Sequence, residues 1–238
     1  MNLTVARLTV RGLLGRRRGI LLLVAPVLLL VVSLIAKNSD ADQQALATDI
    51  LGRLSLGTLV PLLGLVIGTG VIATEIDDGS IVYLLAKPLP RWKIITTKLA
   101  VAIGVTWLFA AVPSLLAGQI MVGTQDNLAL AFTVGTLVAG AVYSAVFLLL
   151  GVVSRNAVVI GLAYALVWES LVGNFVDGAR TLSIQQWGRS VAHTIATDGA
   201  ITAPVALGVA VPLLIVVSLA ATALATVKLA GLTLSYDE

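Results

Sequence analysis

The chain has 238 residues, of which 58% are hydrophobic and 11% are charged, whereas soluble domains carry about 25% charged residues. This composition excludes an ordinary soluble domain and predicts an integral membrane protein. The net charge of +3 comes from basic residues at the edges of apolar runs, where they set membrane orientation, so we expect no nucleic-acid partner. The sequence has no cysteine and one histidine, so we expect no metal site.

The amino-terminal residues 1–18 predict a short basic helix on the cytoplasmic membrane interface, with Arg7 and Arg11 on one side of the helix. The apolar run 20–36 that follows predicts the first transmembrane helix. A cleaved signal peptide is the alternative, since a basic start and an apolar run precede small residues near Ser39. We favour a retained helix because the chain crosses the membrane several more times.

Five further apolar runs are each about 19 to 26 residues long, enough to cross a hydrocarbon core of about 30 Å. These predicted spans are residues 54–74, 99–122, 128–153, 157–175 and 203–227. The fold class is therefore all-α, a polytopic membrane protein with six transmembrane helices in one domain, 1–238. Gly64 and Gly68 lie four residues apart in the second span and predict the close approach of a neighbouring helix.

The outer segment 176–202 lies between the last two spans. It carries four apolar residues at helical spacing: Ile184, Trp187, Val191 and Ile195. This spacing predicts a structured outer hairpin or interfacial helix.

The basic residues are distributed unequally between the two sides of the membrane. With the amino terminus inside, eleven of the 15 Lys and Arg residues are on the inner side: Arg7, Arg11, Arg16, Arg17, Arg18, Lys87, Arg91, Lys93, Lys98, Arg155 and Lys228. The outer segments hold Lys37, Arg53, Arg180 and Arg189. Because cytoplasmic loops carry the excess of basic residues, we expect both termini and the loop 75–98 in the cytoplasm.

The loop 75–98 contains the signals of a short helix over residues 79–86. Asp78 is placed to cap its first turn, and Asp77 adds negative charge at that end. The helix ends before Pro88, because a proline disfavours the helical conformation of the residue before it. Its apolar face consists of Ile81, Leu84 and Leu85. An apolar face on a helix outside the membrane predicts a protein partner.

The spacing of polar, glycine and proline residues in this loop resembles the first cytoplasmic loop of ABC-2 type transporter permeases. The residues that carry the resemblance are Glu75, Gly79, Ser80, Leu84, Leu85, Pro88, Arg91 and Lys98. The resemblance implies a coupling helix that rests in a groove of a separate ATP-hydrolysing subunit. It thereby implies a set of ATPase-contacting residues: Glu75, Asp77, Asp78, Gly79, Ser80, Ile81, Leu84, Leu85, Pro88 and Arg91.

The same resemblance implies the permease subunit of an exporter in the cell membrane. Its partners would be a second permease copy or homologue and two ABC ATPase subunits, which bind ATP and Mg, so that this chain needs no cofactor. In that family the second and fifth spans line the central path, and the segment before the last span dips back into the outer leaflet. The implied path residues are Ser55, Thr58, Leu62, Ala165, Trp168 and Glu169, with 176–202 as a re-entrant hairpin.

Glu169 is the one acidic residue inside the apolar spans, where an uncompensated charge costs about 2.5 to 3.5 kcal/mol on insertion scales. Three interpretations are open. The carboxylate can pair with Arg180, Arg189 or backbone N–H groups and so help to set an outer gate. It can instead act in the transport path, or it can reach water, because it lies about 20 Å from the inner end of its span.

The sequence has no G-x-x-x-x-G-K-[ST] phosphate-binding loop and no group of Ser, His and acidic residues that resembles a catalytic triad. We therefore expect a transport subunit that is not itself an enzyme. An ion-gradient-driven secondary transporter is one alternative, although such proteins use intramembrane ionisable residues and Glu169 alone is available. A non-transporting membrane anchor or assembly factor is the other. The scarcity of charge in the spans favours an amphiphilic or hydrophobic substrate.

Overall fold

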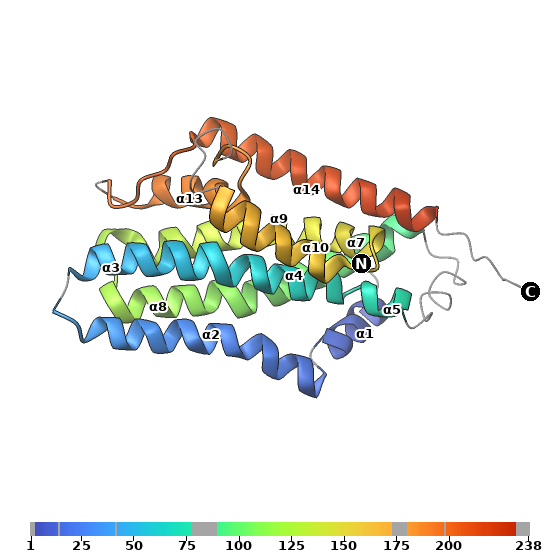
Figure 1. Cartoon of the computed structure of the whole chain (residues 1–238), viewed down its shortest axis with the longest axis horizontal. Helices are drawn as coiled ribbons and strands as arrows, with labels where there is room; N and C mark the ends of the chain where they lie inside the picture. Colours follow the sequence, from blue (N-terminus) through green and yellow to red (C-terminus); the bar gives the residue numbers. More distant parts are fainter. Residues whose placement is uncertain are drawn as a thin grey trace, which may run out of the picture.

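The computed structural model describes residues 3–13, 15–40, 42–77, 90–172, 180–197 and 199–231. Throughout these ranges every regular element is a helix, which confirms the all-α class (Figure 1). Four helices of the described chain are long and apolar enough to cross a membrane: Gln43–Gly70, Arg91–Val122, Gln125–Val153 and Leu207–Ala230. Two shorter apolar helices are Leu22–Lys37 and Ala157–Glu169. Each of the six predicted spans therefore overlaps an apolar helix, four of which have membrane length within the described residues.

The first two of these helices are joined by a short turn. Helix α2 (Arg16–Lys37) contains Pro26, and the next helix is continuous through α3 (Gln43–Ile50), a π-helix (Leu51–Leu59) and α4 (Val60–Gly70). It begins at Gln43 rather than at residue 54, because the Asp42 side chain accepts hydrogen bonds from the free N–H groups of Gln44 and Ala45 at 3.0 and 3.4 Å. Helix α5 (Ala73–Asp77) follows.

The third and fourth spans form a long helical hairpin. One side consists of α7 (Arg91–Thr106), a π-helix (Trp107–Ala111) and α8 (Val112–Val122), and the other of α9 (Leu128–Val153). The tight turn predicted between them is present, with Gly123 at a φ of 59° that favours glycine. Helix α9 has the same bounds as the predicted span 128–153, whereas the preceding helix starts at Arg91 rather than at residue 99.

The remaining helices are α10 (Ala157–Ala163), which continues as a π-helix (Tyr164–Val172), then α13 (Ile184–Ile195) and α14 (Leu207–Ala230). Helix α13 confirms the helix predicted within 176–202. Two residues of the predicted apolar face, Ile184 and Trp187, are buried, and Val191 and Ile195 are partly buried.

Helix α9 lies at the centre of the bundle and packs against α4, α8, α13 and α14. Its core side chains include Tyr143 and Phe147, whose rings stack at 5.9 Å. Helix α4 packs closely against these two side chains. A Cβ added at Gly64 would lie 2.8 Å from the Tyr143 Cβ, and one added at Gly68 would lie 2.9 Å from the Phe147 Cβ. The close approach predicted from the glycine spacing is thus made inside the chain, between α4 and α9.

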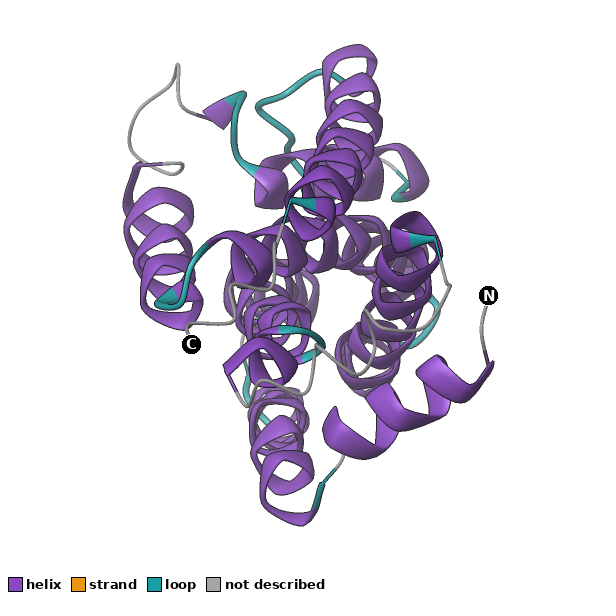
Figure 2. Cartoon of the chain, turned by 90° about the vertical axis from the view of Figure 1, so that its right-hand side faces the viewer, coloured by secondary structure: helices purple, strands orange, loops and turns teal. Residues whose placement is uncertain are grey.

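Helix α1 (Leu3–Leu13), α5 and the end of α14 lie at one end of the bundle, and the turns before α3 and α9 lie at the other (Figure 1). Seen from the first end, most helices run nearly along the line of sight, while α1 lies obliquely across it (Figure 2). Helix α1 buries Val5 and Leu13 and exposes Arg7 and Arg11. This two-sided pattern agrees with the predicted amphipathic helix, but the predicted bounds 1–18 are too long, because α1 ends at Leu13 and Arg16 begins α2.

Candidate functional site

The loop predicted to couple to an ATPase begins and ends at a buried ion pair. Lys98 in α7 donates hydrogen bonds to the Val71 carbonyl oxygen at 2.5 Å and to Glu75 Oε1 at 2.6 Å. The Lys98 side chain is 0% exposed and that of Glu75 is 30% exposed. Helix α4 ends at Gly70, so the ammonium group also satisfies a backbone acceptor beyond that helix end. The pair therefore fixes α5 to α7, on both sides of the loop.

The predicted ATPase-contacting residues are only partly within the described structure. Glu75 and Asp77 lie in α5, and Arg91 is the partly buried first residue of α7. Glu75 directs one carboxylate oxygen towards Lys98 of its own chain. The predicted helix 79–86 lies outside the described residues, together with the following set: Asp78, Gly79, Ser80, Ile81, Leu84, Leu85 and Pro88.

The three residues predicted for the path on the second span do not share one face. Ser55 is fully buried and its hydroxyl is hydrogen-bonded to that of Ser114 in α8. Thr58 is exposed and donates to the Arg53 carbonyl oxygen at 3.0 Å, and Leu62 is partly exposed. Ser55 and Thr58 lie in a π-helix, which has more residues per turn than an α-helix and so turns the side chains of residues three apart further away from each other.

On the fifth span the predicted path residues turn towards the interior of the subunit. Ala165 is 3% exposed, Glu169 is 0% exposed and Trp168 is partly buried. The lipid-accessible or partner-accessible face of this helix is instead apolar, with Leu166 and Val167 exposed. Burial of Glu169 excludes the interpretation that its carboxylate reaches water.

Within the described part of the chain, Glu169 accepts hydrogen bonds from at least three donors. Its Oε1 accepts from the Tyr164 hydroxyl and from the Ile184 N–H, both at 3.0 Å, and its Oε2 accepts from the Ser183 hydroxyl at 2.5 Å. Ser183 is the N-cap of α13 and also accepts from the Gln186 N–H at 3.3 Å. A negative carboxylate at a helix N-terminus is favourable because the free N–H groups point towards it.

Of the partners that the sequence predicted for Glu169, the described contacts include one backbone N–H group, that of Ile184, together with two hydroxyls that were not predicted. The ion pairs within the described ranges are Arg53–Asp49 and Lys98–Glu75, so neither Arg180 nor Arg189 forms one with Glu169. Ser183 was missed. Its signal was present, because a serine followed three residues later by Gln186 is the pattern of a capping box.

Helix α13 extends along α9 from the far turn towards Glu169. Beyond its carboxyl end, the Thr197 N–H donates to the Asp126 carbonyl oxygen at 3.1 Å, next to the start of α9. Farther along, Gly188 meets Gly135, where an added Cβ would lie 2.6 Å from the Gly188 carbonyl oxygen. The amino end of α13 is held by Glu169 of the fifth span. One short helix therefore joins the far turn to the interior of the bundle.

No curated protein sequence matches this chain. A protein family described as ABC-2 family transporter protein matches residues 5–188. The matched region contains most of α1, the buried pair Lys98–Glu75 and Glu169. Because the match spans more than half of the chain and agrees with the apolar helices of the structure, the chain belongs to the ABC-2 transporter family and is a transmembrane permease of that family.

Proposed function

We propose that the chain is the permease subunit of an ATP-driven exporter and that it couples to a separate ABC ATPase through the loop 75–98. The observation that carries this proposal is the buried pair Lys98–Glu75, which fixes the two ends of that loop to each other. A force applied to the loop would then act on α4 and α7 together. Coupling between distant sites needs such a continuous, rigid connection.

Two ATPase subunits and a second permease copy or homologue complete the assembly in this proposal. ATP and Mg bind to the ATPase subunits, and the chain itself carries no cofactor. Thr58 and Leu62, which are accessible on the second span, are the stronger candidates for the path between two permease copies. Ser55 lies inside its own subunit, so a role for Ser55 in the path would require movement of α8.

We further infer that all six apolar helices span the cell membrane and that α13 is re-entrant from the outer side. A helix of 12 residues is about 18 Å long at 1.5 Å per residue, enough to pass from the surface to the middle of the bilayer. The free backbone N–H groups at the amino end of α13 need hydrogen-bond acceptors there, because unpaired backbone groups are excluded from the hydrocarbon. Ser183 and Glu169 supply such partners.

Pull-down of the ATPase tests the docking of the loop. Burial of one leucine contributes about 1.5 to 3 kcal/mol, so Leu84→Asp or Leu85→Asp should strongly reduce co-purification of the ATPase with the permease in mild detergent. Tyr83→Asp is the matched control, because residue 83 lies on the opposite face of the predicted helix 79–86. Membrane insertion should be the same for all three variants.

Transport that matches the parent in both leucine variants, with the ATPase still bound, would show that the loop is not the docking element. Equal losses in Tyr83→Asp would instead show a general effect of a new charge. Only selective loss in Leu84→Asp and Leu85→Asp supports a partner on the predicted apolar face.

A further inference from the structure

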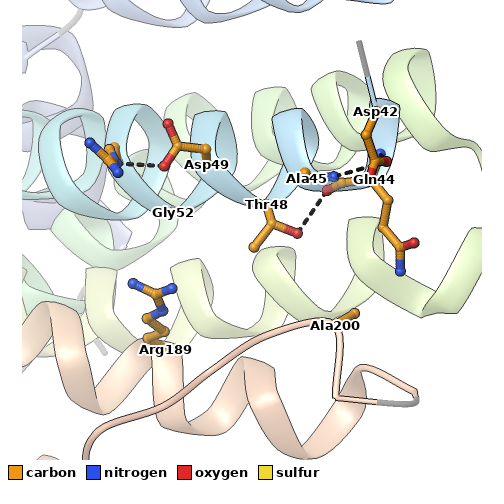
Figure 3. Close-up of a pocket in the computed structure, with 9 residues that line it drawn as sticks. Asp42, Gln44, Ala45, Thr48, Asp49, Gly52, Arg189 and Ala200 are labelled. Carbon is orange, nitrogen blue, oxygen red and sulfur yellow. Dashed lines mark hydrogen bonds and ion pairs between the residues drawn. The ribbon is translucent and has the colours of Figure 1, made fainter.

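Arg189 in α13 lies between two polar cavities. The first has a volume of about 420 Å³ and is lined by Thr48, Asp49, Arg53 and Arg189 among others. The second has a volume of about 360 Å³ and is lined by Arg180, Thr202 and again Arg189. Figure 3 shows the Arg189 side chain rising from α13 towards the helix that carries Asp49 and Gly52. One residue, Arg189, therefore lines both cavities.

The Arg189 guanidinium is incompletely satisfied within the described chain. Its Nε is buried and has no hydrogen-bond acceptor there. The nearby Asp49 carboxylate is already paired with Arg53 Nε at 2.5 Å. Burial lowers the pKa of Arg189, while Asp49 opposes this shift, and an arginine keeps its charge at neutral pH. A partly desolvated cation whose nearest carboxylate is shared with Arg53, and whose Nε has no acceptor, favours a further anionic ligand.

The other acidic residue of the first cavity is also engaged. Asp42 caps α3 by accepting from the N–H groups of Gln44 and Ala45. Thr48 donates its hydroxyl to the Gln44 carbonyl oxygen at 2.9 Å. The Asp49 carboxylate is therefore shared between Arg53 and the nearby Arg189. Arg53, with a side chain 80% exposed, adds a second positive charge at the cavity rim.

We propose that Arg189 binds an anionic group, a phosphate or a carboxylate, in the cavities that it lines. The planar guanidinium suits these groups because its parallel N–H donors match two oxygens of one anion. Each of the two cavities is larger than a bare anion and has room for a small polar group to which the anion is attached. The anion comes either from a lipid headgroup of the adjacent leaflet or from a soluble molecule, and both sources present the same oxygens to Arg189.

Binding is measured on the purified chain, so it does not depend on the ATPase partner. Inorganic phosphate is added to the protein in neutral detergent, and its effect on the thermal unfolding midpoint gives an apparent affinity. In a second arm, the chain is placed in phosphatidylcholine nanodiscs with and without phosphatidylglycerol, and retained phosphatidylglycerol is counted by mass spectrometry. A response to phosphate indicates a soluble anion, and retention of phosphatidylglycerol alone indicates a lipid headgroup.

Arg189→Gln should weaken the observed binding by at least about tenfold, because a charge-assisted pair is lost. Arg189→Lys should bind with intermediate strength, since it keeps the charge and loses the planar fork. The matched control is Arg155→Gln, which removes an exposed arginine between α9 and α10 and should bind as the parent does. The absence of binding in both arms, or equal binding by the parent, Arg189→Gln and Arg189→Lys, would overturn the proposal.

Discussion

Glu169 shows how a single side chain can place a charge inside an apolar bundle. Insertion of a carboxylate costs about 2.5 to 3.5 kcal/mol, and each hydrogen bond to a charged group returns about 1.5 to 3 kcal/mol. Three donors, from Tyr164, Ser183 and Ile184, therefore suffice to offset the cost. These contacts explain why Glu169 is buried. We propose that Glu169 affects transport through its contact with α13.

Removal of the Glu169 side chain should destabilise the fold. Glu169→Ala leaves the three donors unsatisfied and should lower the free energy of unfolding by about 3 kcal/mol or more. Glu169→Gln keeps an acceptor oxygen and should cost less. Unfolding measured in detergent gives the order of stability of the parent and the two variants, and transport should fall in the same order.

A double-mutant cycle separates the contact at α13 from general damage. Ser183→Ala removes one donor to Glu169 and also the N-cap of α13, so the part of its effect that comes from the Glu169 contact should disappear once Glu169→Ala is present. Additive effects of the two substitutions, or an alanine variant as stable and active as the parent, would refute the tie between the fifth span and α13.

The connection between α4, α5 and α7 illustrates a device at the scale of elements. Helix α4 ends at Gly70, before the loop begins at Glu75. The ammonium group of Lys98 binds both the chain beyond that end, at Val71, and the carboxylate of α5. Neither helix end would otherwise be fixed to α7 by a charged group. Three elements are held together by one side chain, as transmission of movement from the loop requires.

Lys98→Met should separate ATP hydrolysis from transport. The variant leaves the Val71 carbonyl and the Glu75 carboxylate without this donor, a cost of about 1 to 3 kcal/mol for each group. We expect the ATPase to co-purify as before while transport per ATP hydrolysed falls severalfold, a ratio measured in proteoliposomes. Lys93→Met is the matched control, because Lys93 lies on the same helix and is exposed. An unchanged ratio in Lys98→Met would eliminate the proposed connection.

At the scale of the whole molecule, the described turns and short helices divide between the two ends of the bundle. The turns before α3 and α9 share one end, and α1 and α5 share the other (Figure 1). The basic residues predict the second end to be cytoplasmic. The polar cavities at Arg189 then open towards the outside, so the proposed anion site and the proposed ATPase site lie on opposite sides of the membrane.

Cysteine labelling checks this orientation, and the absence of native cysteine makes it direct. Ser39→Cys, in the turn before α3, should react in intact cells with an impermeant thiol reagent added outside. Asn156→Cys, in the turn before α10, should react only after the membrane is opened. Both positions are exposed. The reverse pattern would invert the topology and place the loop 75–98 outside.

The sequence by itself determined the helical class, the membrane location and the apolar runs, because hydropathy and helix signals act over neighbouring residues. Only the tertiary structure decided the partners of the buried charges. Lys98 meets Val71 and Glu75 at separations of 27 and 23 residues, and Glu169 meets Ser183 and Ile184 at 14 and 15. The direction in which the Ser55 side chain points was likewise decided by the π-helix that contains it. These features depend on which helix ends meet in space, and local periodicity does not contain that information.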